Sequence, residues 1–183
     1  MQEYNNRPFL ICSGFHRSAT SATTRWLSNA GVKLGDNLMG SNVHNPKGYY
    51  EDKNVVALHN ELLHSNQTSW QSTSPIVLTQ TPLMADYLAS RESEYLHPND
   101  VLGFKDPRAL LFLPHWHQAL QGRGRYLFVI RHWSSCIESL LNRHSKNLAY
   151  SLKPIKDDNL DIQFWSNPTL AAKMWLNYNS QLF

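Results

Sequence analysis

Apolar and polar residues alternate along this chain in blocks that indicate strands followed by helices. Three short apolar runs, at 9–12, 101–104 and 126–130, predict buried strands, because a strand covered on both faces is continuously apolar. Apolar residues spaced three and four apart predict helices, which we place at 18–30, 55–64, 82–94, 133–143 and 167–176. A further helix should open at Asp106-Pro107, with Pro114 kinking or restarting it.

Three segments lack this periodicity. Residues 35–50 are rich in Gly, Asn and Pro and are expected to form a long loop, while the Ser/Thr-rich residues 65–79 are left unassigned. Residues 144–166 are polar and are expected to form an irregular, mobile segment.

The order of these elements predicts an α/β fold in three layers, a parallel sheet flanked by helices on both faces. One domain is expected to span residues 1–183. Three strands are few for such a sheet, and the chain ends directly after a predicted helix. We therefore expect either that a carboxy-terminal portion is missing or that the fold is a reduced one.

Composition narrows the class of protein. Hydrophobic residues make up 42% of the 183 residues and charged residues 17%, which supports a buried core. Lys plus Arg is 17 and Asp plus Glu is 14, a net charge of +3 that suits an anionic ligand and is too small to indicate a nucleic-acid surface.

No apolar run approaches the ~18 residues that span a bilayer, and the first residues lack a secretory signal, so a cytoplasmic protein is expected. Cys12 and Cys136 are too few for a disulfide framework or a cysteine zinc site.

The clearest chemistry lies between the first predicted strand and helix, in Gly14-Phe15-His16-Arg17-Ser18-Ala19-Thr20-Ser21. A strand-to-helix turn presents unpaired backbone N–H groups at the positive end of the helix dipole, where a phosphate can accept from several of them. Arg17 adds a guanidinium, and Ser18, Thr20 and Ser21 add hydroxyls. The alternative is a tight turn with Ser18 as the helix cap. The Gly-Lys pair of nucleoside-triphosphate loops is absent, which argues against an ordinary ATP or GTP hydrolase.

This octet resembles the 5′-phosphosulfate loop of sulfotransferases that use 3′-phosphoadenosine 5′-phosphosulfate (PAPS). In many bacterial members that loop is Gly-x-His-Arg-Ser-Gly-Thr-Ser, from which this chain departs at Ala19. Three further segments are similar to the family in order and spacing, namely Asn45-Pro46-Lys47-Gly48-Tyr49-Tyr50-Glu51-Asp52, Phe104-Lys105-Asp106-Pro107-Arg108, and Val129-Ile130-Arg131 with Ser139. The family has Asp-Pro or Asn-Pro after the arginine of the last segment, where this chain has His132-Trp133.

The resemblance implies a P-loop-like sulfotransferase fold and PAPS as co-substrate. Its 5′-phosphosulfate would lie on a cradle formed by Gly14, His16, Arg17, Ser18, Ala19, Thr20 and Ser21. Its 3′-phosphate would be bound by Arg131 and Ser139, a guanidinium fork and a hydroxyl suited to a phosphate monoester. No metal ion is expected, because a sulfuryl group carries less charge than a phosphoryl group.

An acceptor hydroxyl or amine must lose a proton during transfer, so a general base is expected. Glu51 is the preferred candidate, with Asp52, His44, His16 and Asp106 as alternatives, although His16 is expected to belong to the wall of the cradle. Lys105 is expected to neutralise the leaving phosphate or to orient the acceptor. The acceptor itself stays open among carbohydrates, lipid-linked sugars, small alcohols and phenols.

Two other functions stay open. One is a small-molecule kinase with an altered phosphate loop, in which Asp106 would bind the magnesium ion of ATP. The other is a non-catalytic domain that binds an adenosine phosphate. A role for Glu51 or Asp52 in merely favouring the start of the next helix is the structural alternative to the base.

Overall fold

The structure is a computed structural model of the 183-residue chain, and it describes residues 7–42, 45–46, 48–78, 82–94, 97, 99–152, 154, 156 and 158–182. Its elements follow in the order β1 (Phe9–Ser13), α1 (Thr20–Asn29), α2 (Lys53–Ser65), α3 (Leu83–Glu94), β2 (Leu102–Lys105), the 3-10 helix η2 (Pro107–Phe112), α4 (Leu113–Leu120), β3 (Gly124–Phe128), α5 (Trp133–Ala149), α6 (Leu160–Ser166) and α7 (Pro168–Asn179).

Three parallel strands form the sheet, in the order β2-β1-β3. Phe9 of β1 pairs with Leu102 of β2 on one side and with Gly124 of β3 on the other. Side chains alternate between the faces of β1. Phe9 and Ile11 therefore join the main hydrophobic core, whereas the Cys12 sulfur accepts a hydrogen bond from Thr24 of α1 on the other face. This explains why the run at 9–12 is apolar throughout.

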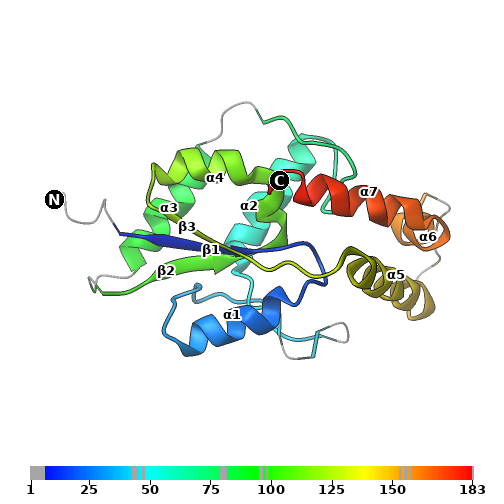
Figure 1. The fold of residues 1–183 in the computed structure, drawn as a ribbon, viewed down its shortest axis with the longest axis horizontal. Helices are drawn as coiled ribbons and strands as arrows, with labels where there is room; N and C mark the ends of the chain where they lie inside the picture. The colour runs from blue at the N-terminus through cyan, green and yellow to red at the C-terminus, as the bar shows by residue number, and fades with distance from the viewer. Residues whose placement is uncertain are drawn as a thin grey trace.

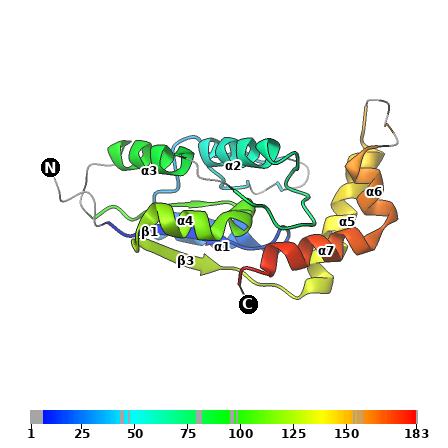
Figure 2. The same ribbon diagram turned by 90° about the horizontal axis from the view of Figure 1, so that it is seen from above.

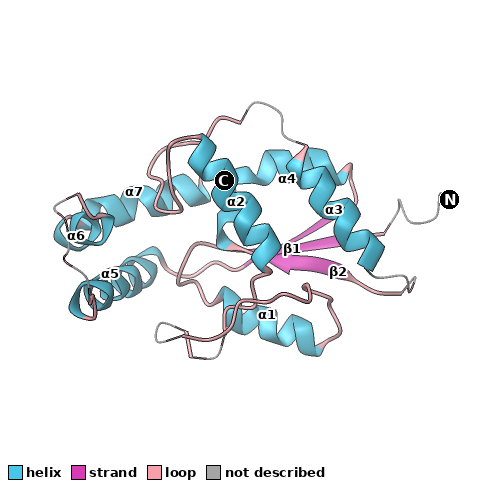
Figure 3. Cartoon of the chain, turned by 180° about the vertical axis from the view of Figure 1, so that it is seen from behind, coloured by secondary structure: helices cyan, strands magenta, loops and turns pink. Residues whose placement is uncertain are grey.

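The sheet has helices on both faces, which confirms the predicted α/β architecture with its parallel sheet (Figure 1). Helix α1 covers one face, and α2, α3 and α4 cover the other, as the view from behind also shows (Figure 3). Helices α5, α6 and α7 pack together beyond the carboxyl ends of the strands (Figure 2). No helix in the described part of the chain is long and apolar enough to cross a membrane.

Several element boundaries differ from the sequence-based predictions. Strand β3 ends at Phe128, so the apolar residues that follow belong to a connection, and Ile130 is 60% exposed. Helix α5 continues to Ala149, and α6 forms at Leu160–Ser166, so the prediction of an irregular segment at 144–166 was wrong over both of these stretches. Burial explains the error: His144 is buried against Trp70 and Phe164 although its neighbours along the chain are polar.

Two predicted helix starts were resolved by the structure. The stretch after Asp106 begins as a 3-10 helix and restarts as α4 at Leu113, with Pro114 in its first turn, as the proline predicted. Helix α1 is capped by Ala19 rather than by Ser18, and the cap makes no side-chain hydrogen bond. The expected helix cap by the Ser18 hydroxyl, which was part of the structural alternative for the octet, is therefore wrong.

Candidate functional site

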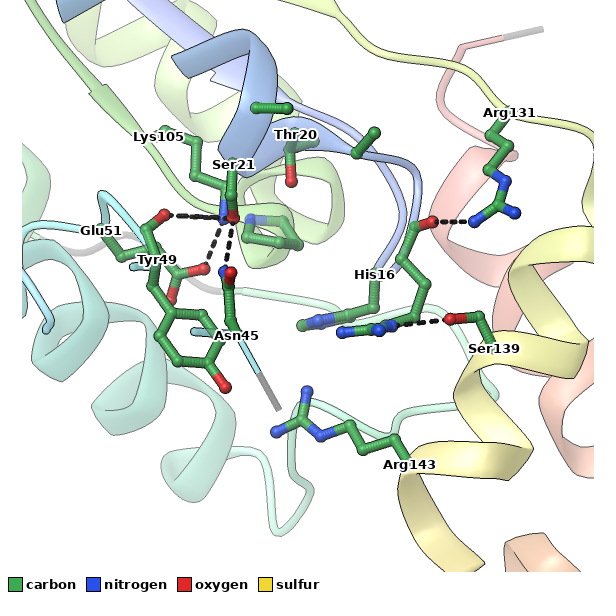
Figure 4. Close-up of a pocket in the computed structure, with 14 residues that line it drawn as sticks. His16, Thr20, Ser21, Asn45, Tyr49, Glu51, Lys105, Arg131, Ser139 and Arg143 are labelled. Carbon is green, nitrogen blue, oxygen red and sulfur yellow. Dashed lines mark hydrogen bonds and ion pairs between the residues drawn. The ribbon is translucent and has the colours of Figure 1, made fainter. Parts of the chain in front are cut away.

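A pocket of about 270 Å³ opens at the carboxyl ends of β1 and β2, just below the ~300–1,000 Å³ that is typical of small-molecule sites. Ligands of open parallel sheets bind at this edge, where loops leave the strands. Figure 4 shows its side chains converging from the turn after β1, the loop before α2, the end of β2 and helix α5. The pocket is lined by His16, Arg17, Ala19, Thr20, Ser21, Ala22, Asn45, Tyr49, Glu51, Lys105, Pro107, Arg131, Ser139 and Arg143.

The turn between β1 and α1 has the backbone geometry of an anion cradle. Arg17 and Ala19 both lie in the left-handed region, at φ of 71° and 72°, while Ser18 between them does not. Alternation of this kind turns successive N–H groups toward one concave side. The first amides of α1 have no intrahelical acceptor, and they add to the same side.

Gly14 and Ser18 lie behind this cradle rather than in the lining of the pocket. A Cβ on Gly14 would lie 2.3 Å from the carbonyl oxygen of Val129, so only glycine permits the strands to approach so closely here. The buried Ser18 hydroxyl has no hydrogen-bond partner within the described residues. Of the predicted cradle residues, His16, Arg17, Ala19, Thr20 and Ser21 reach the pocket.

The second predicted anchor is joined directly to the cradle. The Arg17 Nε donates to Ser139 Oγ of α5 at 2.9 Å, and Arg131 Nη1 donates to the Arg17 carbonyl oxygen at 3.1 Å. Arg131 does not end a strand, as the apolar run had suggested; it lies three residues beyond β3, in the connection to α5. Arg17 and Arg131 therefore line the same pocket, and Figure 4 shows Arg131 beside Ser139 at one side of it.

Opposite these arginines, the pocket wall contains a buried ion pair. Lys105 Nζ lies 2.6 Å from Glu51 Oε1, and both side chains are buried. The same ammonium group lies 3.4 Å from the Tyr49 carbonyl oxygen and 3.5 Å from Ser21 Oγ. The Lys105 ammonium thus connects β2 to the loop before α2 and to the first turn of α1 (Figure 4).

Behind this ion pair lies a second one that does not reach the pocket. Asp106 accepts from Arg108 Nη1 at 2.8 Å and from His59 Nδ1 at 2.9 Å. The Trp116 indole can only donate, and it donates to His59 Nε2, so the His59 proton lies on Nδ1. Burial alone would raise the pKa of Asp106, but Arg108 and His59 outweigh it and hold the pKa well below its usual range. Glu51, Lys105, Asp106 and Arg108 are called the paired cluster below.

Two other base candidates, Asp52 and Asp106, are absent from the lining of the pocket. Asp52 caps α2 by accepting from the Asn54 N–H, and it also accepts from the Tyr87 hydroxyl. His44 lies outside the described residues. His16 reaches the pocket, but burial, and then the nearby Arg108 and Arg143, lower its pKa well below 6.5. Among the described candidates, Glu51 alone combines a carboxylate with a place in the pocket lining.

Arg143 is a pocket residue to which the sequence analysis gave no role. It lies one helical turn beyond Ser139 on α5, and its guanidinium packs over the Trp70 indole with 4.8 Å between the Cζ atom and the ring centre. Its spacing of four from Ser139 was the available signal, but Trp70 comes from the segment that was left unassigned. Arg17, Arg131 and Arg143 are called the arginine cluster below.

The lining of the pocket is strongly cationic. Four of its side chains carry a positive charge, and one of the described lining residues, Glu51, is acidic and already paired. Burial lowers the pKa of Arg17, and the positive charge of Arg143 lowers it further, which shows that the guanidinium groups of the cluster repel one another. No group of three or more His, Cys, Asp and Glu side chains in the described chain is arranged to hold a metal ion.

Comparisons with known proteins yield no match. Neither a protein-family model, nor a curated protein, nor a solved structure is similar enough to this chain to be matched with it. The function must therefore be argued from the pocket itself.

Proposed function

We propose that this domain is a PAPS-dependent sulfotransferase with a P-loop-like fold, which transfers a sulfuryl group to a hydroxyl or amine acceptor. The single observation that carries the proposal is the excess of positive charge in a pocket formed by a strand-to-helix cradle and a second arginine anchor. Guanidinium groups that lie close together repel one another, and an anion bound between them offsets that repulsion. A ligand with two separate anionic ends fits such a pocket.

The placement of the two anchors supports a donor with a phosphate at each end of a nucleoside. The amides of Ala19, Thr20 and Ser21 at the start of α1 would receive the 5′-phosphosulfate. Arg131 and Ser139 would bind the 3′-phosphate from the connection to α5 and from α5 itself. Arg17 contacts both regions, since its Nε donates to Ser139 and its backbone belongs to the cradle.

In the proposed reaction, the acceptor oxygen attacks the sulfur atom in line with the leaving phosphate. A new oxygen–sulfur bond forms, and the bond between the sulfur and the bridging oxygen of the 5′-phosphate breaks. That oxygen keeps the electron pair and leaves with adenosine 3′,5′-bisphosphate, and the acceptor proton passes to the Glu51 carboxylate. Lys105 Nζ, which also lies near Ser21 Oγ of the cradle, would offset charge on the leaving phosphate.

The runner-up, a kinase that uses ATP and magnesium, receives less support. In that reaction Asp106 would bind the metal ion, yet both of its oxygens accept hydrogen bonds from Arg108 and it also pairs with His59. Asp106 is moreover fully buried and absent from the lining of the pocket.

Titration calorimetry tests the ligand class directly. We expect adenosine 3′,5′-bisphosphate to bind at least tenfold more tightly than ATP, with or without magnesium. Tighter binding of magnesium-ATP, with no binding of the bisphosphate, would reverse the order of the two functions. A non-catalytic domain would bind the bisphosphate and never transfer sulfate from labelled PAPS to a panel of sugars, alcohols and phenols.

The role of Glu51 is tested by Glu51→Gln, with the exposed Glu61→Gln of α2 as the matched control. Loss of a general base should lower transfer by about 10²–10⁴-fold while bisphosphate binding is retained. Unchanged transfer in the Glu51 variant would show that another group accepts the proton.

A further inference from the structure

Arg143 lies on a different side of the pocket from the two proposed phosphate anchors. Figure 4 shows its guanidinium reaching into the pocket from below, across from Ser21 and apart from Arg131. Its Cα belongs to α5, one turn beyond Ser139, so the helix presents both side chains toward the cleft.

A flat aromatic surface holds this guanidinium. Its Cζ atom lies 4.8 Å from the centre of the Trp70 ring. Trp70 is itself fixed: its ring stacks on His144 at an interplanar angle of 10°, and its carbonyl oxygen accepts from Tyr178 at 2.5 Å. The platform therefore sets the position of Arg143 and leaves the edge of its planar fork toward the pocket.

Arg143 has no ion pair with any residue that the structure describes, and its Nε is buried without a hydrogen-bond partner. Its charge lies close enough to Arg17 and His16 to disfavour their protonated forms, in addition to the effect of burial. A cation kept beside another cation and supplied with no carboxylate is a site that gains from an incoming anion.

We propose that Arg143 recognises an oxyanion on the acceptor, so that the acceptor of this enzyme is an acidic molecule. This inference rests on the proposed function, in which the donor occupies the cradle and the Arg131–Ser139 anchor. The acceptor would present its reacting hydroxyl or amine to Glu51 and its carboxylate, phosphate or sulfate group to the edge of the Arg143 guanidinium. Arg143 is thus a specificity-determining residue.

The test saturates the protein with adenosine 3′,5′-bisphosphate and then titrates it with inorganic sulfate or with acetate at constant ionic strength. We expect at least one of these anions to bind to the complex with a millimolar dissociation constant. Arg143→Gln should weaken that binding at least tenfold and change the affinity for the bisphosphate less than twofold. Arg143→Lys, which keeps the charge but loses the fork, should weaken anion binding by an intermediate amount.

Arg125→Gln is the matched control, because Arg125 is exposed on β3 and donates to the carbonyl oxygens of Gly122 and Gly124. Arg125→Gln removes the same charge and should leave the affinity for the anion within twofold of that of the wild type. Preference for sulfate over acetate identifies a tetrahedral group on the acceptor, and the reverse identifies a carboxylate.

Three results would overturn the inference. In the first, the bisphosphate complex of the wild type binds neither sulfate nor acetate, or the complex of Arg143→Gln binds the anion as tightly as the wild type does. Either outcome would show that the subsite does not exist. Arg143→Gln weakens the bisphosphate as strongly as the anion, in which case Arg143 contacts the donor. Failure of the wild-type protein to bind the bisphosphate at all overturns the proposed function as well, and the first titration separates that case from the others.

Discussion

Two groups of charged side chains, one lining the pocket and one partly behind its wall, are stabilised in opposite ways. In the paired cluster, each buried charge lies beside a charge of opposite sign, such as Lys105 with Glu51 and Arg108 with Asp106. In the arginine cluster, Arg17 donates to a hydroxyl, Arg131 donates to a backbone carbonyl oxygen and Arg143 packs over an indole ring. The first arrangement neutralises buried charge within the protein, and the second leaves positive charge in the lining of the pocket.

This difference follows from burial. Asp106 is fully buried, where an unpaired charge would be prohibitively costly, so the fold supplies Arg108 and His59. Arg131 is exposed and Arg143 is half-buried, so water and an aromatic face suffice. Variants of Asp106, which does not reach the pocket, should therefore change stability, whereas variants of Arg131 and Arg143 should change binding.

The largest expected effect comes from breaking the paired cluster at Asp106. Asp106→Asn removes the carboxylate that pairs with the buried His59 and with Arg108, leaving Arg108 only Glu51 Oε2 at 3.7 Å, and should lower the free energy of unfolding by about 3–5 kcal/mol. Urea unfolding measures this loss of free energy. The exposed Asp158→Asn is the control and should change the free energy by less than about 0.5 kcal/mol. A loss below about 1 kcal/mol for Asp106→Asn would mean that the pairing contributes little.

Arg131→Gln should show the opposite behaviour. In the proposed complex the exposed guanidinium would donate a charge-assisted hydrogen bond to the 3′-phosphate, so its loss should weaken bisphosphate binding by about 1–3 kcal/mol, several-fold to a hundredfold. The free energy of unfolding should stay within about 0.5 kcal/mol of the wild type. Calorimetry and urea unfolding of the same preparation measure both, and unchanged binding would remove Arg131 from the site.

His16 lies near Arg108 of the paired cluster and Arg143 of the arginine cluster. Its titration should make the stability of the protein depend on pH. Burial, followed by Arg108 and Arg143, lowers its folded-state pKa below the unfolded value of 6.5. Below pH 6.5 the unfolded chain therefore binds a proton that the folded chain refuses, and stability falls as the pH falls, by up to about 1.4 kcal/mol per pH unit. His144, whose pKa is also lowered by burial, acts in the same direction.

The test compares urea unfolding between pH 7 and pH 5 for the wild type, His16→Gln and the exposed control His64→Gln of α2. Only His16→Gln should flatten the loss of stability, by close to one proton, while the slope due to His144 remains. Equal slopes in all three proteins would mean that His16 titrates alike in both states.

Local signals in the sequence predicted the parts of the site that are local in the fold. The strand-to-helix turn with Gly14 and Arg17 could be predicted because the conformation of a turn depends on residues that are adjacent in sequence. Lys105 and Glu51 were both named, but their ion pair joins residues 54 apart and no periodicity foretells it. Whether the site transfers sulfate stays a prediction.

Long-range packing explains most of what the sequence did not reveal. The role of Arg143 depends on Trp70, which reaches α5 from a Ser/Thr-rich segment without periodicity. The continuation of α5 past Arg143 depends on the burial of His144, whose partners come from other parts of the chain. A polar segment is assigned as irregular when the residues that cover it are distant in sequence.

The smallest expected effect concerns the cradle itself. Ala19 has a φ of 72°, a left-handed conformation that costs an L-residue about 1–2 kcal/mol and costs glycine nothing comparable. Its side chain is exposed and contributes little packing. Ala19→Gly should therefore raise the free energy of unfolding by about 0.5–1 kcal/mol, the relief of strain being partly offset by the greater freedom of glycine in the unfolded chain.

Ala22→Gly is a control of opposite sign, because Ala22 is exposed within α1 and a glycine there should cost about 1 kcal/mol. The same substitution three residues apart thus separates backbone strain from helix propensity. Urea unfolding of both variants is the measurement. Destabilisation by Ala19→Gly would mean that the turn after β1 does not hold the left-handed conformation that presents its amides to an anion.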